Sequence, residues 1–193
     1  MSSNSFDLLP IDRRTRRTRA LLAEALMDLG VARNIDAIDI GDLTKAAGIG
    51  RSTFYAHYAG RDDFMISSFV NLIVMAEEAL ATRYPERPDI IPSDPLFAHI
   101  FEAGDFARNV AKSEIFPRQM AAAEGKLQEI AEKNLSRRMP DLPKIRRQET
   151  AIYIAAGFIG LLRWWMTGGL KQSPQEMQRA FFRLSMSALA SEA

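Results

Sequence analysis

Apolar residues recur at spacings of three and four along almost the whole chain, which is the spacing of one face of an α-helix. Within residues 13–29, for example, Leu22, Leu26 and Leu29 share such a face. Alternating apolar and polar runs bounded by turns, which mark half-buried strands, are essentially missing. The pattern therefore predicts an all-α protein.

Helix start and stop signals divide this pattern into separate helices. Gly30 follows the first helix in the position of a C-terminal cap, and Ser173, Pro174 and Glu176 form a capping box at the start of the last one. The helices predicted after the first cover residues 40–47, 51–58, 62–84, 95–111, 114–123, 124–139, 144–167 and 174–191. We expect an N-terminal head with an N-terminal arm, residues 1–61, followed by a helical bundle, residues 62–193.

The second and third predicted helices are separated only by Gly48, Ile49 and Gly50. So short a link makes two helices cross at a steep angle, as in a helix-turn-helix. Asp39 can cap the second helix, with Asp42 three residues further on. The apolar side chains expected to point inward are Leu43, Ala47, Ile49, Phe54 and Tyr58.

Composition narrows the class of protein. With 47% hydrophobic and 25% charged residues, the chain has the balance of a globular protein. It has no cysteine, which excludes disulfides, thiolate zinc sites and cysteine nucleophiles and suits a reducing compartment. No signal-peptide core follows the N-terminal arginines, and the longest uncharged apolar run, 151–162, is shorter than the about 20 residues of a membrane span. We therefore expect a cytoplasmic protein without a membrane partner.

Positive charge is concentrated near the N-terminus, although the net charge is only +1. Five arginines fall within seven positions, namely Arg13, Arg14, Arg16, Arg17 and Arg19. Such a cluster fits a surface that meets backbone phosphates. A solvated first helical turn explains the cluster equally well from the sequence alone.

Residues 39–64 read DIGDLTKAAGIGRSTFYAHYAGRDDF. The segment combines an Ala-Gly-Ile-Gly turn at 47–50, Ser-Thr-Phe-Tyr at 52–55, His-Tyr at 57–58 and a basic-acidic step at 61–63. This combination resembles the helix-turn-helix of the TetR family of transcriptional repressors, over residues 13–64. The resemblance implies a homodimer that binds double-stranded operator DNA and is released by an unidentified small-molecule ligand, with no cofactor.

The third predicted helix would enter the major groove. Arg51, Ser52 and Tyr55 share the face opposite the inward-pointing aromatic residues, because residues three and four apart lie on one side of a helix. Arg51 can reach the acceptors of guanine, and the hydroxyls of Ser52 and Thr53 can contact bases or phosphate. The phosphate contacts implied by the resemblance are Tyr55, His57 and Arg61. A merely solvated helix face is the alternative for Arg51 and Tyr55.

Two glycines depart from the family pattern. Gly50 stands where serine is usual, so it can cap the third helix only through its backbone. Gly41 stands where many relatives carry a polar or basic side chain, so its backbone is the candidate DNA contact. Thr44 and Lys45 are further candidate contacts on the second helix, for which a structural role is equally well supported.

The C-terminal half carries large apolar side chains but no comparable motif. Such residues form either the core of a helical bundle or, collectively, a ligand pocket. The candidate ligand-binding residues are Phe97, Phe101, Phe116, Met120 and Tyr153. Residues 158–189 resemble, loosely, a TetR subgroup that includes regulators of dihydroxyacetone kinase, and this resemblance fixes no ligand.

The penultimate helix contains a small-residue surface where two backbones can approach closely, formed by Ala155, Ala156, Gly157 and Gly160. The family pairs its last two helices with those of a symmetry mate, so the resemblance implies a dimer interface here. The candidate interface residues are Gly157, Gly160, Leu161, Trp164, Phe181 and Leu184. Close packing within one subunit is the alternative.

Two other functions are open from the sequence. A structural DNA-binding protein would share the head but would need neither a palindromic site nor an inducer pocket. An all-α enzyme would need matched metal or acid–base ligands in its core, and His99 and Glu102 supply a single His-x-x-Glu pair. The sequence therefore favours a regulator over an enzyme and predicts no metal site.

Overall fold

The computed structural model describes residues 13–84 and 89–190, with side chains through residue 185. The N-terminal arm predicted from the sequence lies outside these residues. Every regular element in them is a helix, which confirms the all-α prediction. The elements are α1 (Arg13–Ala32), the short 3-10 helix η1 (Ile35–Ala37), α2 (Ile40–Ala46), α3 (Arg51–Tyr55), α4 (Arg61–Arg83), α5 (Ser93–Glu102), α6 (Gly104–Val110), α7 (Phe116–Arg138), α8 (Lys144–Thr167) and α9 (Pro174–Ala190).

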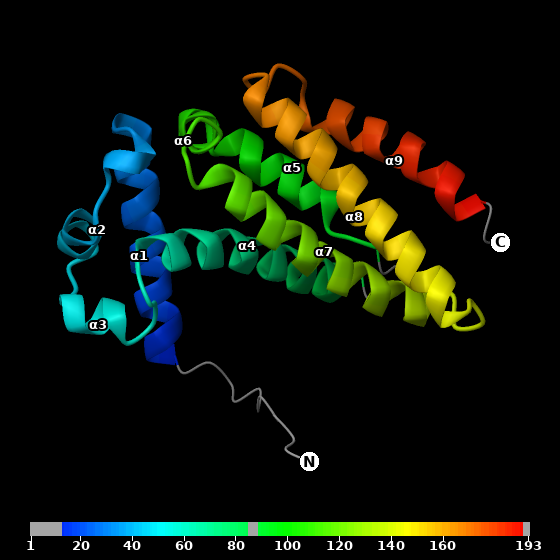
Figure 1. Cartoon of the computed structure of the whole chain (residues 1–193), viewed down its shortest axis with the longest axis horizontal. Helices are drawn as coiled ribbons and strands as arrows, with labels where there is room; N and C mark the ends of the chain where they lie inside the picture. The colour runs from blue at the N-terminus through cyan, green and yellow to red at the C-terminus, as the bar shows by residue number, and fades with distance from the viewer. Residues whose placement is uncertain (1–12, 85–88, 191–193) are drawn as a thin grey trace, which may run out of the picture.

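Two hydrophobic cores organise the chain, one at the α1–α3 end and one in the bundle of α5, α7, α8 and α9 (Figure 1). We call these two parts the head and the body. Helix α4 runs from one into the other, giving Phe64 and Met65 to the head core and Ile73 and Ala76 to the body core. Helix α4 therefore belongs to both parts, and the domain boundary expected at residue 61 stays a proposal.

Two helix starts use the capping chemistry expected from the sequence. Asp39 accepts the backbone N–H of Asp42 at 2.7 Å, and the carboxylate of Asp42 accepts that of Asp39 at 3.3 Å. At α9, the carboxylate of Glu176 accepts the backbone N–H of Ser173 at 2.8 Å, and the Ser173 hydroxyl accepts that of Glu176 at 3.3 Å. Each pair satisfies donors that a helix start leaves without a partner.

Gly30 does not end α1, which continues to Ala32. Gly30 is buried, and a Cβ built on it would lie 2.6 Å from Cδ2 of Phe106 and 2.7 Å from Cδ1 of Ile35. Glycine is required because the Phe106 ring, which belongs to α6, occupies the space of a side chain. The prediction of a C-cap was wrong because it considered only the local sequence.

Other helix boundaries also differ from the prediction. The stretch 95–111 divides into α5 and α6 at Gly104, whose φ of 50° lies in the left-handed region that favours glycine. The stretches 114–123 and 124–139 form the single helix α7, because the one glycine at their junction, Gly125, is isolated and such a glycine is tolerated inside a helix. Helix α3 ends at Tyr55, and the following residues turn, although Ala56 N–H still donates to the carbonyl of Ser52 at 3.0 Å.

One helix in the described part of the chain, α4, is long and apolar enough to cross a membrane, with a mean hydropathy of 1.5 in its most apolar window. The sequence predicts this helix at 62–84, but the criterion of an uncharged apolar run does not select it, because charged residues such as Asp63 and Glu77 interrupt the run. Core helices of globular proteins pass the same test, and here α4 packs against α5 and α7.

Candidate nucleic-acid interface

Three aromatic rings fix α3 to the rest of the head. The ring centroid of Phe54 lies 5.6 Å from that of Tyr58 and 5.8 Å from that of Phe64, and the centroids of Tyr58 and Phe64 are 5.0 Å apart. All three side chains are buried. Such ring pairs add to the free energy gained from burial alone. This aromatic cluster therefore determines which face of α3 points outward.

The turn between α2 and α3 depends on Gly48. Its φ of 64° lies in the left-handed region, where a side chain would be strained. The backbone N–H of Ile49 donates to the carbonyl of Thr44 at 3.0 Å and closes the end of α2. Gly50 then begins α3 with no side-chain cap, as its lack of a hydroxyl requires.

The outward face of α3 carries most of the residues predicted to contact DNA. Arg51, Ser52 and Tyr55 are exposed, Tyr55 by 57%. Thr53 and His57 are partly exposed beside them. On α2, Lys45 is exposed, and Gly41 is partly exposed beside the guanidinium of Arg51. The structure thus brings these side chains to one end of the head.

Two of the predicted contact residues are instead engaged inside the head. Thr44 is buried, and its hydroxyl donates to the carbonyl of Ile40 at 2.8 Å. Arg61 donates through Nε to the carbonyl of Ile38 at 2.7 Å and through Nη2 to that of Ile35 at 2.6 Å. These bonds tie the start of α4 to η1, so Arg61 would have to leave both carbonyls to meet a phosphate.

In the view of Figure 1 the arginine-rich start of α1 lies at the same end of the head as α3. Burial raises the pKa of Tyr58, and the positive charge of Arg19 opposes this rise while the charge of Asp63 adds to it. Arg13, Arg14, Arg16 and Arg17 are exposed on the preceding turns.

Polar contacts hold the head against the body. The side-chain amide of Asn109 donates to a carbonyl in the last turn of α1 at 2.9 Å, and the backbone N–H of Glu114 donates to the carboxylate of Asp36 at 3.2 Å. Nη1 of Arg118 lies 2.6 Å from Oδ2 of Asp62. Sequence reasoning missed these residues because the partners are 56 to 79 positions apart in the chain.

The five residues predicted to bind a ligand do not share one surface. Phe97, Phe116 and Met120 are buried in the body core, whereas Phe101 is 42% exposed and Tyr153 is 56% exposed. The prediction treated these five as a group because all are large and apolar, a criterion that does not separate core from surface. The position of the ligand site stays a prediction.

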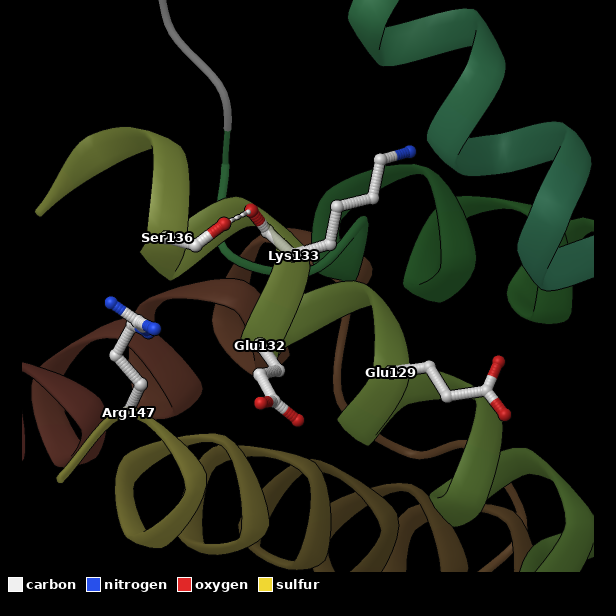
Figure 2. A pocket seen from close by; sticks show the side chains of 5 residues that line it. All are labelled: Glu129, Glu132, Lys133, Ser136 and Arg147. Atoms are coloured by element: carbon white, nitrogen blue, oxygen red, sulfur yellow. Dashed lines mark hydrogen bonds between the residues drawn. The ribbon is translucent and has the colours of Figure 1, made fainter. Parts of the chain in front are cut away.

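A polar pocket of about 440 Å³ opens at the surface between α7 and the start of α8. It is lined by Glu129, Glu132, Lys133, Ser136 and Arg147 (Figure 2). In this view Lys133 and Glu129 point away from Arg147, so the charges of the pocket do not converge on one point. None of the five predicted ligand residues lines this pocket.

The residues predicted for the dimer interface on α8 form an exposed stripe. Gly157 and Gly160 are exposed, Leu161 is partly exposed, and Trp164 is 56% exposed. Ala155, which was expected in the same small-residue surface, is fully buried instead. The stripe therefore follows one side of α8 only.

On α9 the exposed aromatic residue is Phe182 rather than Phe181. Phe181 is buried, with its ring centroid 5.4 Å from that of Phe158 in the same subunit. Phe182 is 60% exposed and Leu184 is 50% exposed. Phe182 was not among the predicted interface residues, because two adjacent phenylalanines do not reveal from sequence which one faces the core.

Helices α2 and α3, joined by a tight turn and with one face of α3 exposed, have the arrangement of a helix-turn-helix. Residues 94–187 match the family model TetR_C_8, transcriptional regulator C-terminal region. Over 56 residues, 28% of the chain, the sequence is 41% identical to an uncharacterized HTH-type transcriptional regulator, YxbF, of Bacillus subtilis (strain 168). That match spans 15% of the length of YxbF.

Solved structures of the same fold include the dihydroxyacetone kinase operon activator DhaS, with a TM-score of 0.67 and 15% identity over 88% of this chain and 94% of that one. A TetR transcriptional regulator from Rhodococcus sp. RHA1 has a TM-score of 0.62 and 10% identity over 91% of this chain and 98% of that one. At these identities the likeness shows the fold alone.

These matches support a TetR-family transcriptional regulator, and the relatives that they name are transcriptional regulators rather than enzymes. In keeping with this, His99 and Glu102 are exposed on α5 rather than enclosed in a core.

Proposed function

We propose that this protein is a DNA-binding transcriptional regulator whose helix α3 enters the major groove of operator DNA. The observation that carries the proposal is the exposed face of α3, where Arg51, Ser52 and Tyr55 point away from the buried aromatic cluster. A recognition helix reads base edges with side chains near its N-terminus. An arginine and two hydroxyl residues stand there in α3.

Each contact has a proposed role. Arg51 reads a guanine through two hydrogen bonds, and Ser52 and Thr53 contact neighbouring bases or phosphate. Tyr55 and His57 meet phosphates, and the arginines at the start of α1 add positive charge beside them. Arg61 is left out of this set, because its guanidinium is held by carbonyls of the head.

The test is a pair of binding titrations with full-length protein, on a duplex selected from a random library and on a scrambled duplex. Arg51→Ala should cost about 1–3 kcal/mol per half-site on the selected duplex and much less on the scrambled one. Tyr55→Phe, which keeps the ring, should weaken both duplexes alike without changing the salt dependence, since the lost contact carries no charge.

Three results would change the proposal. Equal losses on both duplexes for Arg51→Ala would show that Arg51 positions the protein and that Ser52 or Thr53 reads the base. Equal affinity of the unaltered protein for both duplexes would favour a structural DNA-binding protein. Failure to bind either duplex would overturn the DNA-binding proposal itself.

We also propose that two copies pair through the exposed stripe of α8 and the neighbouring face of α9. Trp164 and Phe182 are each more than half exposed, and large exposed apolar side chains are typical of an interaction surface. A two-fold dimer would present two heads to a pseudo-palindrome with half-site centres about one DNA turn, or a multiple of it, apart.

Sedimentation analysis at micromolar concentration tests this arrangement. The unaltered chain should sediment as a dimer, and Gly157→Arg should shift it to a monomer. Gly125→Arg is the matched control, because Gly125 is also exposed on a body helix and a Cβ there, as at Gly157, meets no atom within 4 Å. A monomeric unaltered chain would contradict the proposal.

For regulation we propose repression that is released by a small, largely apolar ligand bound in the body near Phe97, Phe116 and Met120. These large side chains are buried in the body core, so a ligand would have to displace or reorder them. A ligand can shift the chain from a binding to a released state only if its affinity for the two states differs. Phe101 and Tyr153, at the surface, would take part only through such a rearrangement.

A thermal-shift screen followed by operator titrations tests the regulatory part. We expect compounds that raise Tm to weaken operator binding, and substitution of Met120 by alanine to alter their affinity. Compounds that raise Tm without changing operator affinity would contradict ligand release and leave the DNA-binding proposal intact.

A further inference from the structure

Gly41, in the first turn of α2, lies directly beside the guanidinium of Arg51. A Cβ built on Gly41 would stand 2.9 Å from Nη2 and 3.9 Å from Cζ of Arg51. The same point is 3.0 Å from Oδ1 of Asp39, the carboxylate that caps α2. Guanidinium and carboxylate therefore lie on the same side of Gly41, and the bare Cα leaves the space that the guanidinium occupies.

Two properties of this contact separate it from ordinary packing. The atoms that a side chain at 41 would meet first are the end of a flexible arginine, so the arginine can move and the backbone can stay. Position 41 also lies inside a helix, where alanine is more favourable than glycine. A glycine here consequently gains nothing for α2 through helix propensity, and the side chains for which it leaves room are Arg51 and, at 3.0 Å, the capping carboxylate of Asp39.

We infer that Gly41 is a specificity-determining position that acts through Arg51. By having no side chain, it allows the Arg51 guanidinium to lie across the first turn of α2, and this sets the direction from which the guanidinium approaches a base edge. The inference rests on the proposed function, in which α3 reads the major groove. It assigns Gly41 a positioning role that differs from the backbone DNA contact expected from the sequence.

The experiment selects duplexes from a random library with four full-length proteins: the unaltered chain, Gly41→Ala, Arg51→Ala and the double variant. The readout is the relative preference for each base at each position. Preferences are ratios between duplexes competing in one reaction, so a smaller folded fraction of any variant does not alter them. Gly125→Ala on α7 is the matched control, because it adds the same methyl group at a helical glycine where, unlike at Gly41, a Cβ meets no atom within 4 Å.

We expect Gly41→Ala to reduce the guanine preference at the position that Arg51→Ala also affects, by at most the roughly 5- to 150-fold that a bidentate contact provides. In the Arg51→Ala background, Gly41→Ala should change nothing further, because the two residues act through one contact. Gly125→Ala should match the unaltered chain.

Two outcomes would overturn the inference. One is a Gly41→Ala profile identical to that of the unaltered chain. The other is a Gly41→Ala change of the same size with and without Arg51, which would mean that position 41 contacts DNA by itself. If the unaltered chain enriches no sequence, the proposed function fails first, so the two failures are distinguishable.

Discussion

The head and the body differ in how their buried core residues and their exposed contact residues are arranged. In the head, Phe54 and Tyr58 are buried on one side of α3 while Arg51 and Tyr55 are exposed on the other. In the body, large rings such as Phe97 and Phe158, 5.0 Å apart, fill the core, and exposed rings lie on α8 and α9.

This difference explains why one function is readable from sequence and the other is not. A recognition surface needs particular polar residues at fixed positions on a short helix, so local spacing reveals it. A ligand site in a helical bundle depends on how distant helices pack, and the same apolar residues serve both core and pocket. The following changes test whether head and body are as separate as their two cores indicate.

The largest effect is expected for Phe54→Ala. Removing this fully buried ring should destabilise the head by about 3–5 kcal/mol, since phenylalanine is lost together with three ring contacts. Hydrogen exchange should show loss of protection in α1–α3, with protection kept in α7 and α8. Phe101→Ala, at a body ring that is 42% exposed, should cost much less. Equal loss of protection in the body would mean that the two cores unfold as one.

A smaller effect is expected for Arg61→Met, which keeps an unbranched apolar stem and removes the guanidinium donors. The carbonyls of Ile35 and Ile38 would lose a charged partner, at a cost of about 1.5–3 kcal/mol in the free energy of unfolding. Urea unfolding measures this cost. The salt dependence of DNA binding should not change, and a slope lowered by about one would restore Arg61 to the phosphate contacts.

The close contact between Gly30 of α1 and Phe106 of α6 is tested by replacing glycine with alanine at two positions, one in this contact and one in open space. Gly30→Ala should destabilise the protein by about 1–3 kcal/mol, because its Cβ would overlap the Phe106 ring. Gly125→Ala, in an open position of α7, should stabilise it by about 0.5–1 kcal/mol, because alanine favours the helix. Thermal unfolding of both variants gives the comparison. The same sign for both would show that Phe106 adjusts freely.

Local signals predicted the local features correctly. The capping boxes at Asp39 and Ser173 and the full extent of α8 follow from residues within one or two turns. The outward orientation of Arg51 and Tyr55 follows from their spacing against Phe54. Each of these depends on neighbours in the sequence.

Features that depend on distant residues were missed or misplaced. Gly30 is explained by Phe106 on another helix, and Arg61 by carbonyls more than 20 residues earlier in the chain. Phe181 and Phe182 have the same chemistry, and only the position of Phe158 decides which of them is buried. The spacing of apolar residues identifies which face of a helix is buried, whereas the tertiary structure decides which residues pack against that face.

The smallest effect concerns Glu176 at the start of α9, far from the head. Hydrogen bonds from the Ser173 backbone N–H and then from its hydroxyl lower the pKa of Glu176 below its ordinary value of 4.5. A lowered pKa in the folded state means that the charged carboxylate stabilises the fold above pH 4.5, and that this contribution is lost as the pH falls through the folded-state pKa. Glu176→Gln should therefore lower Tm slightly at pH 7, and the difference from the unaltered chain should shrink steadily below pH 4.5. Glu78→Gln, at an exposed position of α4, controls for the general loss of one negative charge. A Tm difference that stays constant down to pH 3 would show that the carboxylate charge is not what stabilises this helix start.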